Sequence, residues 1–301
     1  MAARTSRGNP LGGPLDAGPG PVPKALAAAL EAVHDRFHRI EHLDQDPLRF
    51  PRRYADPRDQ EIVGLLAASF AFGRVRAFLP VLERLFARLG PHPAATLVEA
   101  TQDDLAELAA GFVYRFVDAA HLLAMLSGLG LVLREDGGLR PAFQAGFDTS
   151  GQAIEGLRRL AGRIRAAAGP AGPGFLLPVG RPQDPAKRLN LFLRWMVRDD
   201  GIDLGTWPGI PKNALLVPMD VHVCRIARLL GLIPMHRSGP RLTDAIGLTR
   251  ALATIDPEDP VRFDFALSHL GISGACKGTP DRETCPGCAL AGLCVHERDG
   301  R

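Results

Sequence analysis

Apolar residues recur every three to four positions along most of the chain, which is the period of an amphipathic α-helix. Strand-like alternation of apolar and polar residues is nowhere sustained. The pattern therefore predicts an all-α protein. The helices that it predicts most clearly run over residues 24–42, 57–72, 75–89, 118–134 and 152–168, and another starts at Thr101 in a capping-box-like TQDD segment.

A Gly- and Pro-rich connection over residues 169–185 divides the predicted helices into two blocks. The first residues of the chain are also rich in Gly and Pro and lack the apolar stretch of a signal peptide. We therefore expect two lobes. The predicted segments are a disordered tail (1–23), an N-terminal helical segment packing with the C-terminal lobe (24–56), a helical barrel (57–205) and a C-terminal lobe (206–301).

The second block opens with a helix of two different faces, AKRLNLFLRWMVRDD. Its apolar positions fall at i, i+3, i+4 and i+7 and predict a buried stripe of Leu189, Phe192, Leu193 and Met196. Lys187, Arg194 and Arg198 fall on the other side, which predicts an exposed cationic face. A surface face neutralised by Asp199 and Asp200 is the alternative.

Composition and charge narrow the class of protein. The chain has 301 residues, of which 46% are hydrophobic and 23% charged, and no apolar run is long enough to cross a bilayer. We expect a monomeric cytoplasmic protein without a membrane segment. The net charge is only +3, but arginines cluster, as at Arg74 and Arg76. This clustering favours an anionic partner, although solvated helix faces also explain single clusters.

Four cysteines close the chain in the order C-x8-C-x2-C-x5-C: Cys276, Cys285, Cys288 and Cys294. One C-x-x-C hook flanked by wider spacings fits a cubane iron–sulfur cluster better than a zinc knuckle, which usually brings two hooks. Zinc remains the alternative ligand. Disulfides are disfavoured because the cysteine count is odd and no secretory signal precedes them.

A second motif lies in residues 218–230, PMDVHVCRIARLL. Asp220 directly precedes a periodic helix and is placed to cap its first turn. Cys224 falls on the apolar face of this helix, so we expect it in the core and not among the ligands. Taken alone, an aspartate in this position indicates a helix cap more often than a catalytic group.

The two motifs together resemble a known superfamily. Asp220-Val221-His222-Val223 with Arg225, the DFALSHLG segment and the cysteine loop resemble the helix-hairpin-helix DNA glycosylases, in the iron–sulfur branch typified by endonuclease III and the adenine mismatch glycosylase. The first cysteine spacing is longer here than in that branch. Residues 59–78 resemble its early barrel helix. Residues 49–300 more closely resemble a bacterial family defined only as a domain of unknown function.

The resemblance implies a fold and a function. It implies a two-lobed glycosylase-like fold with a C-terminal [4Fe–4S] loop, held by the four cysteines and acting on double-stranded DNA in the nucleoid. Asp220 would stabilise the cationic sugar as a damaged or mispaired base leaves, or activate the attacking water. Lys212 is the nearest candidate for the nucleophilic lysine of bifunctional members. Gly209 would approach a phosphate through its backbone.

Charge placement adds further candidate phosphate contacts around the expected DNA cleft. They are Lys187, Arg194 and Arg198, with Lys277 and Arg282 in the cysteine loop.

The hairpin departs from the superfamily pattern. Its candidate, Trp207-Pro208-Gly209-Ile210-Pro211-Lys212, has Pro211 where a glycine is usual, and Asp220 follows Pro208 sooner than in the superfamily. A monofunctional glycosylase that needs no lysine is therefore the first hypothesis. A non-catalytic iron–sulfur DNA-binding protein of the same fold is the second, and an electron-transfer protein is the third. Phe70 stands where a duplex-plugging residue is expected, but a core position explains it as well.

Overall fold

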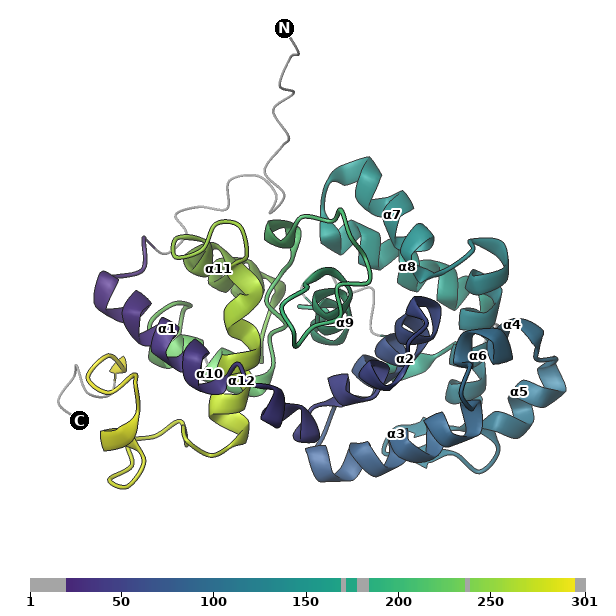
Figure 1. Cartoon of the computed structure of the whole chain (residues 1–301), viewed down its shortest axis with the longest axis horizontal. Coiled ribbons are helices and arrows are strands. Elements are labelled where there is room, and N and C mark those ends of the chain that lie inside the picture. The colour runs from purple at the N-terminus through teal and green to yellow at the C-terminus, as the bar shows by residue number, and fades with distance from the viewer. Residues whose placement is uncertain (1–19, 169–171, 178–183, 236–238, 296–301) are drawn as a thin grey trace, which may run out of the picture. The chain divides into compact units, whose positions relative to one another are not determined.

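The protein is all-α, as the periodicity predicts. The computed structural model describes residues 20–168, 172–177, 184–235 and 239–295 (Figure 1). In these residues no helix is both long and apolar enough to cross a bilayer. The α-helices are α1 (Lys24–Phe37), α2 (Pro57–Ser69), α3 (Val75–Leu89), α4 (Pro93–Glu99), α5 (Gln102–Ala109), α6 (Ala119–Glu135), α7 (Leu139–Ser150), α8 (Ala153–Ala167), α9 (Lys187–Val197), α10 (Val221–Leu229), α11 (Leu242–Ala253) and α12 (Asp264–Ile272).

The helix starts follow the capping signals of the sequence. Asp56 accepts a hydrogen bond from the Arg58 backbone N–H at 2.8 Å and starts α2. Thr101 and Asp104 form the predicted capping box of α5. The helix expected over 24–42 is shorter, because α1 ends at Phe37 and a 3-10 helix follows at Ile40–Gln45.

The strands in the described residues form one small antiparallel hairpin, β1 (Val113–Tyr114) and β2 (Val117–Asp118). Arg115 and Phe116 make its two-residue loop. Arg115 has a φ of +54°, a left-handed conformation that suits tight hairpin loops.

The chain divides into two compact units. Of the described residues, unit 1 takes those within Met1–His42, Arg181–Asn190 and Ile210–Arg301, and unit 2 takes those within Leu43–Gly180 and Leu191–Gly209. The predicted domain bounds stay a prediction. The disordered tail expected over 1–23 lies outside the described residues up to residue 19, as does much of the connection expected over 169–185.

In unit 2, a buried carboxylate joins α2 to the start of α7 and to Trp207. Glu61 of α2 accepts a hydrogen bond from the Leu139 backbone N–H at 3.0 Å and from the Trp207 indole N–H at 2.7 Å. Burial raises the pKa of the Glu61 carboxyl, and these donors oppose that rise. The side chain therefore joins α2 to the start of α7 and to the segment after α9. Phe70, at the end of α2, is fully buried and is a core residue.

Helix α9 corrects one prediction. Its apolar stripe is buried as expected, but Arg194 and Arg198 are not on an exposed face, since they are only 1% and 2% exposed. Both guanidiniums pair with the buried Asp203, at 3.0 Å from Arg194 and 2.6 Å from Arg198. The carboxylate compensates the buried cations, so neither arginine is available to a phosphate. Burial raises the pKa of Asp203 against the opposing pull of the two guanidiniums.

Unit 1 gathers α1, α10, α11 and α12, and an aromatic and histidine cluster lies where α1 contacts α12. The rings of His34 and His38 stack with centroids 4.5 Å apart. The ring centroids of His42 and His269 lie 5.2 Å apart. Phe265 packs against both His38 and His269. Burial, with the neighbouring His38, lowers the pKa of His34, and burial, with the neighbouring His269, lowers the pKa of His42.

These lowered pKa values predict an acid-sensitive fold. When the folded pKa lies below the unfolded value of about 6.5, the unfolded chain binds more protons at lower pH, so stability falls as pH falls through and below about 6.5. We expect the thermal unfolding midpoint of the parent protein to drop on acidification. The midpoint of the His34→Phe/His42→Phe double variant should drop by less. Melting curves at matched ionic strength measure both. An equal drop in the two proteins would assign the effect to other groups.

Candidate functional site

Asp220 caps α10 with one carboxylate oxygen and binds a second helix with the other. Its Oδ1 accepts a hydrogen bond from the Val223 backbone N–H at 2.7 Å. Its Oδ2 accepts a hydrogen bond from the Ser268 hydroxyl of α12 at 2.9 Å. The predicted cap is confirmed. Both oxygens of the Asp220 side chain are thus oriented by hydrogen bonds.

The next residues of α10 fix its distance from α12. A side chain at Gly271 would meet the His222 ring, with the added carbon only 2.6 Å from the Nδ1 atom. The imidazole therefore lies directly against the α12 backbone. The His222 Nδ1 atom is buried and has no hydrogen-bond partner among the described residues. Val221, by contrast, is 71% exposed at the start of the helix, beside Asp220.

Arg225, one turn further along α10, holds the start of the cysteine loop. Its guanidinium donates a hydrogen bond to the Cys276 carbonyl at 2.8 Å. The side chain passes over Gly278, where an added carbon would clash with it and where φ is +81°. A glycine is needed here for both reasons. The D-V-H-V-x-R motif thus joins Asp220, α12 and the cysteine loop through one helix.

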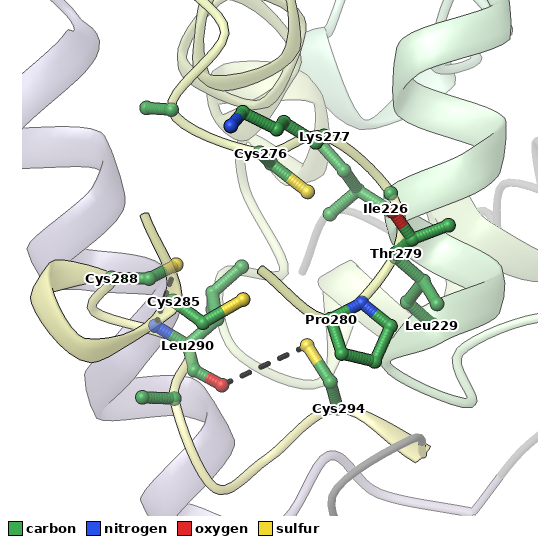
Figure 2. A pocket seen from close by; sticks show the side chains of 13 residues that line it. Ile226, Leu229, Cys276, Lys277, Thr279, Pro280, Cys285, Cys288, Leu290 and Cys294 are labelled. Atoms are coloured by element: carbon green, nitrogen blue, oxygen red, sulfur yellow. Dashed lines mark hydrogen bonds between the residues drawn. The ribbon is translucent and has the colours of Figure 1, made fainter. Parts of the chain in front are cut away.

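The four terminal cysteines line one cavity of about 40 Å³. Figure 2 shows their sulfur atoms turned toward a shared space. The apolar walls of the cavity come from Ile226, Leu229 and Leu290. None of the five cysteines forms a disulfide in the described residues, and Cys224 is buried in the core, as predicted.

Backbone amides point at two of these sulfurs. The Asp281 N–H lies 3.3 Å from the Cys285 sulfur, and the Leu290 N–H lies 3.4 Å from the Cys288 sulfur. Such donors stabilise thiolates and are a regular feature around metal-bound sulfur. Burial raises the pKa of the Cys288 thiol, and the Leu290 amide opposes the rise. The donor set, four thiols in a shared apolar cavity with amide donors, fits a thiolate-bound metal group.

Further contacts hold the cysteine loop. Arg36 of α1 donates a hydrogen bond to the Gly287 carbonyl, inside the C-x-x-C hook, at 3.3 Å. Asp281 pairs with Lys277 at 2.8 Å and accepts hydrogen bonds from the Thr284 backbone and hydroxyl. These donors, Lys277 first, hold the pKa of the Asp281 carboxyl well below its usual range. The loop is thus ordered by side chains both within it and from α1 and α10.

The other predicted site residues lie elsewhere. Lys212 lies 3.9 Å from Asp259, and no contact joins it to Asp220 in the described structure. Gly209 is an exposed turn position with a φ of +88°, and Arg282 is exposed in the cysteine loop. Lys187 is half-buried at the start of α9. Between Pro208 and Asp220 the described helical structure is a single 3-10 turn, Lys212–Ala214.

Sequence reasoning missed several residues of the site. Ser268 and Gly271 both belong to the DFALSHLG segment, but their roles follow only from their contacts with residues of α10 and its N-cap. Arg36 has no sequence signal, because its partner is a backbone carbonyl. Asp281 had a usable signal, since aspartates in loops often accept hydrogen bonds from the backbone about two residues further on, as Asp281 does from Glu283.

Comparison with known proteins gives one family match. Residues 46–273 match a family model described as "Protein of unknown function (DUF2400)". The match includes α10 and α12 and ends before Cys276. No curated protein matches the chain.

The close approach at Gly271 gives a stability prediction. Gly271→Ala must displace the His222 ring or separate the two helices, so we expect a loss of about 1–3 kcal/mol in the free energy of unfolding. Gly162 of α8 is the matched control, because a side chain there meets nothing within 4 Å. Gly162→Ala should stabilise by about 0.5–1 kcal/mol. Urea denaturation measures both, and a neutral Gly271→Ala would contradict the contact.

Proposed function

Since the chain belongs to the DUF2400 family of proteins of unknown function, we propose its function from the geometry around Asp220. The proposal is a DNA glycosylase-like enzyme that removes a damaged or mispaired base by hydrolysing the N-glycosidic bond. One observation carries it: Asp220 is fixed through both oxygens, by the Val223 N–H and the Ser268 hydroxyl, at the N-terminus of a short helix. A negative charge held in this way is suited to a developing cation.

In this proposal the chemistry is simple. The bond between the sugar and the base breaks, and the base leaves with the electron pair. The Asp220 carboxylate stabilises the positive charge that develops on the sugar. A water molecule then adds to the sugar carbon and loses one proton, and the departing base gains one, so that the products are the free base and a sugar hydroxyl. The nucleotide must first leave the base stack, because its glycosidic bond is buried there. Since Lys212 contacts Asp259, we propose water and not a lysine as the nucleophile.

We further propose a [4Fe–4S] cluster held by Cys276, Cys285, Cys288 and Cys294. Supporting this, the four thiols line one apolar cavity, and backbone N–H groups lie 3.3 and 3.4 Å from two of the sulfurs. The single C-x-x-C hook favours a cubane over zinc, since zinc knuckles usually bring two hooks. When bound, the cluster would cross-link the loop. Arg225 and Arg36 would hold the loop around it through its backbone.

The proposed DNA contacts are those that remain accessible. Lys277 and Arg282 lie exposed in the cysteine loop, and Gly209 lies exposed in a turn. The pairing of Lys277 with Asp281 reduces its net attraction for a phosphate, so Arg282 is the stronger candidate. Lys187 remains a further candidate.

A second function has its own support. A non-catalytic iron–sulfur protein that binds DNA would need the cysteine loop but not a full hairpin. The single 3-10 turn between Pro208 and Asp220, and the missing N–H of Pro211, favour this alternative, because they weaken phosphate binding by the hairpin.

The cofactor proposal predicts brown protein. Anaerobically purified chain should carry iron and acid-labile sulfide with broad visible absorbance. Cys288→Ser should lower the iron content, and Cys224→Ser should leave it unchanged because Cys224 lies in the core. Metal analysis decides the matter. Colourless protein with one stoichiometric zinc would establish the alternative ligand instead.

The catalytic proposal predicts a specific loss in Asp220→Asn. Asparagine still caps a helix but carries no charge, so we expect base excision to fall by about a hundredfold or more while DNA binding persists. The assay is strand breakage after alkali on a panel of duplexes that each contain one lesion or mispair.

The matched control is Asp56→Asn, which neutralises the aspartate that caps α2 in unit 2. It should excise like the parent protein. If the parent excises nothing from the whole panel yet binds duplex DNA, the non-catalytic alternative is the better account.

A further inference from the structure

Unit 2 carries an exposed aromatic patch at the end of α2. Three separate segments supply its rings: the turn between α2 and α3, the loop of the β1–β2 hairpin and the 3-10 turn Gly174–Leu176. Phe116 is 66% exposed and Phe175 is 45% exposed. We call Phe72, Phe116 and Phe175, with Arg74, Arg76 and Arg115, the aromatic patch.

The rings of the aromatic patch pack on one another at steep angles. Phe175 lies between the other two, with its centroid 4.9 Å from Phe72 at 80° and 5.8 Å from Phe116 at 69°. Edge-to-face packing of this kind is favourable and holds the rings in place. Exposed apolar side chains that cluster on a folded unit indicate a binding surface, whereas single scattered ones do not.

Arg115 is held over this surface by the backbone. Its φ of +54° turns the hairpin sharply, and its guanidinium lies 5.4 Å from the Phe116 ring centre and 6.0 Å from that of Phe72. Gly73 permits this, because an added carbon there would lie 2.6 Å from the Arg115 Nη1. The Tyr114 hydroxyl donates to the Phe72 carbonyl at 2.5 Å and joins the hairpin to the turn.

The charge of the aromatic patch is positive. Arg74 and Arg76 are exposed and make no ion pair with any described residue. Asp118, at the end of β2, accepts hydrogen bonds at its Oδ1 from the His121 backbone N–H and ring. Three arginines stand against this one carboxylate, and of them Arg115 lies over the exposed rings.

We propose that the aromatic patch binds a single-stranded stretch of nucleic acid, with unpaired bases stacked on Phe116 and Phe175 and the phosphates beside Arg74, Arg76 and Arg115. Rings that stack bases and cations that follow the backbone are the two parts of sequence-independent single-strand binding. A duplex would offer the cations its phosphates, but no base faces for the rings. The inference goes beyond the proposed base excision, because it concerns unit 2 and needs no chemistry at Asp220.

The test is binding of a fluorescent, undamaged oligothymidine by the full-length protein. Phe116→Ala should weaken binding about fivefold or more, which is the lower end of the effect of losing one base–aromatic stack, and Phe116→Trp should restore it. Arg115→Ala should lower the salt slope by about 0.7 unit, as expected for one lost phosphate on a single strand.

Two matched controls isolate the patch. Ile40→Ala removes an exposed apolar side chain in unit 1, and Arg84→Ala removes an exposed arginine elsewhere in unit 2. Both should bind like the parent protein, and so should Asp220→Asn, so that a failure of the excision proposal is distinguished from a failure of this one.

Three results would overturn the inference. One is unchanged oligothymidine binding in the folded Phe116→Ala and Phe175→Ala proteins. Another is binding to vesicles containing anionic lipid that is lost in Phe116→Ala while oligothymidine binding persists. The third is a self-associated parent that becomes monomeric in Phe116→Ala with unchanged oligothymidine affinity, which would make the patch an interface between copies.

Discussion

The contact between α10 and α12 sets the position of the groups in the candidate site. Ser268 and Gly271 lie three residues apart and so share one face of α12, where one donates to Asp220 and the other receives the His222 ring. The hydrogen bond fixes the rotation of α10, and the missing side chain of Gly271 fixes its distance. Arg225, which binds the Cys276 carbonyl, then lies one turn further along the same short helix. A carboxylate and a cysteine loop are thereby held in one rigid relation.

Local patterns predicted a large part of this arrangement. The cap at Asp220, the burial of Cys224 and the apolar stripe of α9 follow from residue type and helical period alone. The failure at Arg194 and Arg198 has a clear physical cause. Periodicity tells which face of a helix is apolar, but not whether the polar face meets water or a buried partner. Asp203, which follows α9, supplies that partner, and no spacing rule predicted it.

Other arginines of the chain also have partners within the protein that the sequence does not reveal. Several of them serve the chain's own backbone, since Arg36 and Arg225 donate to carbonyls of the cysteine loop and Arg52 donates to the Ile202 carbonyl. Carbonyl partners leave no trace in the sequence, so a count of clustered arginines overstates the free positive charge. Arg74 and Arg76, which make no ion pair with any described residue, are the more informative basic positions. Burial and pairing, not number, decide which cations face a ligand.

The buried charges of α9 also restrict how this sequence can change over time. Arg194, Arg198 and Asp203 form one group, which Asp200 joins at 2.8 Å from Arg198. Loss of one partner leaves an uncompensated buried charge and costs about 3–5 kcal/mol, whereas an apolar set of similar volume is often neutral or better. A single substitution in this group is therefore expected to cost more stability than replacement of the whole group by apolar residues of similar volume. The four charges act as one unit, and changes that keep the fold must alter them together.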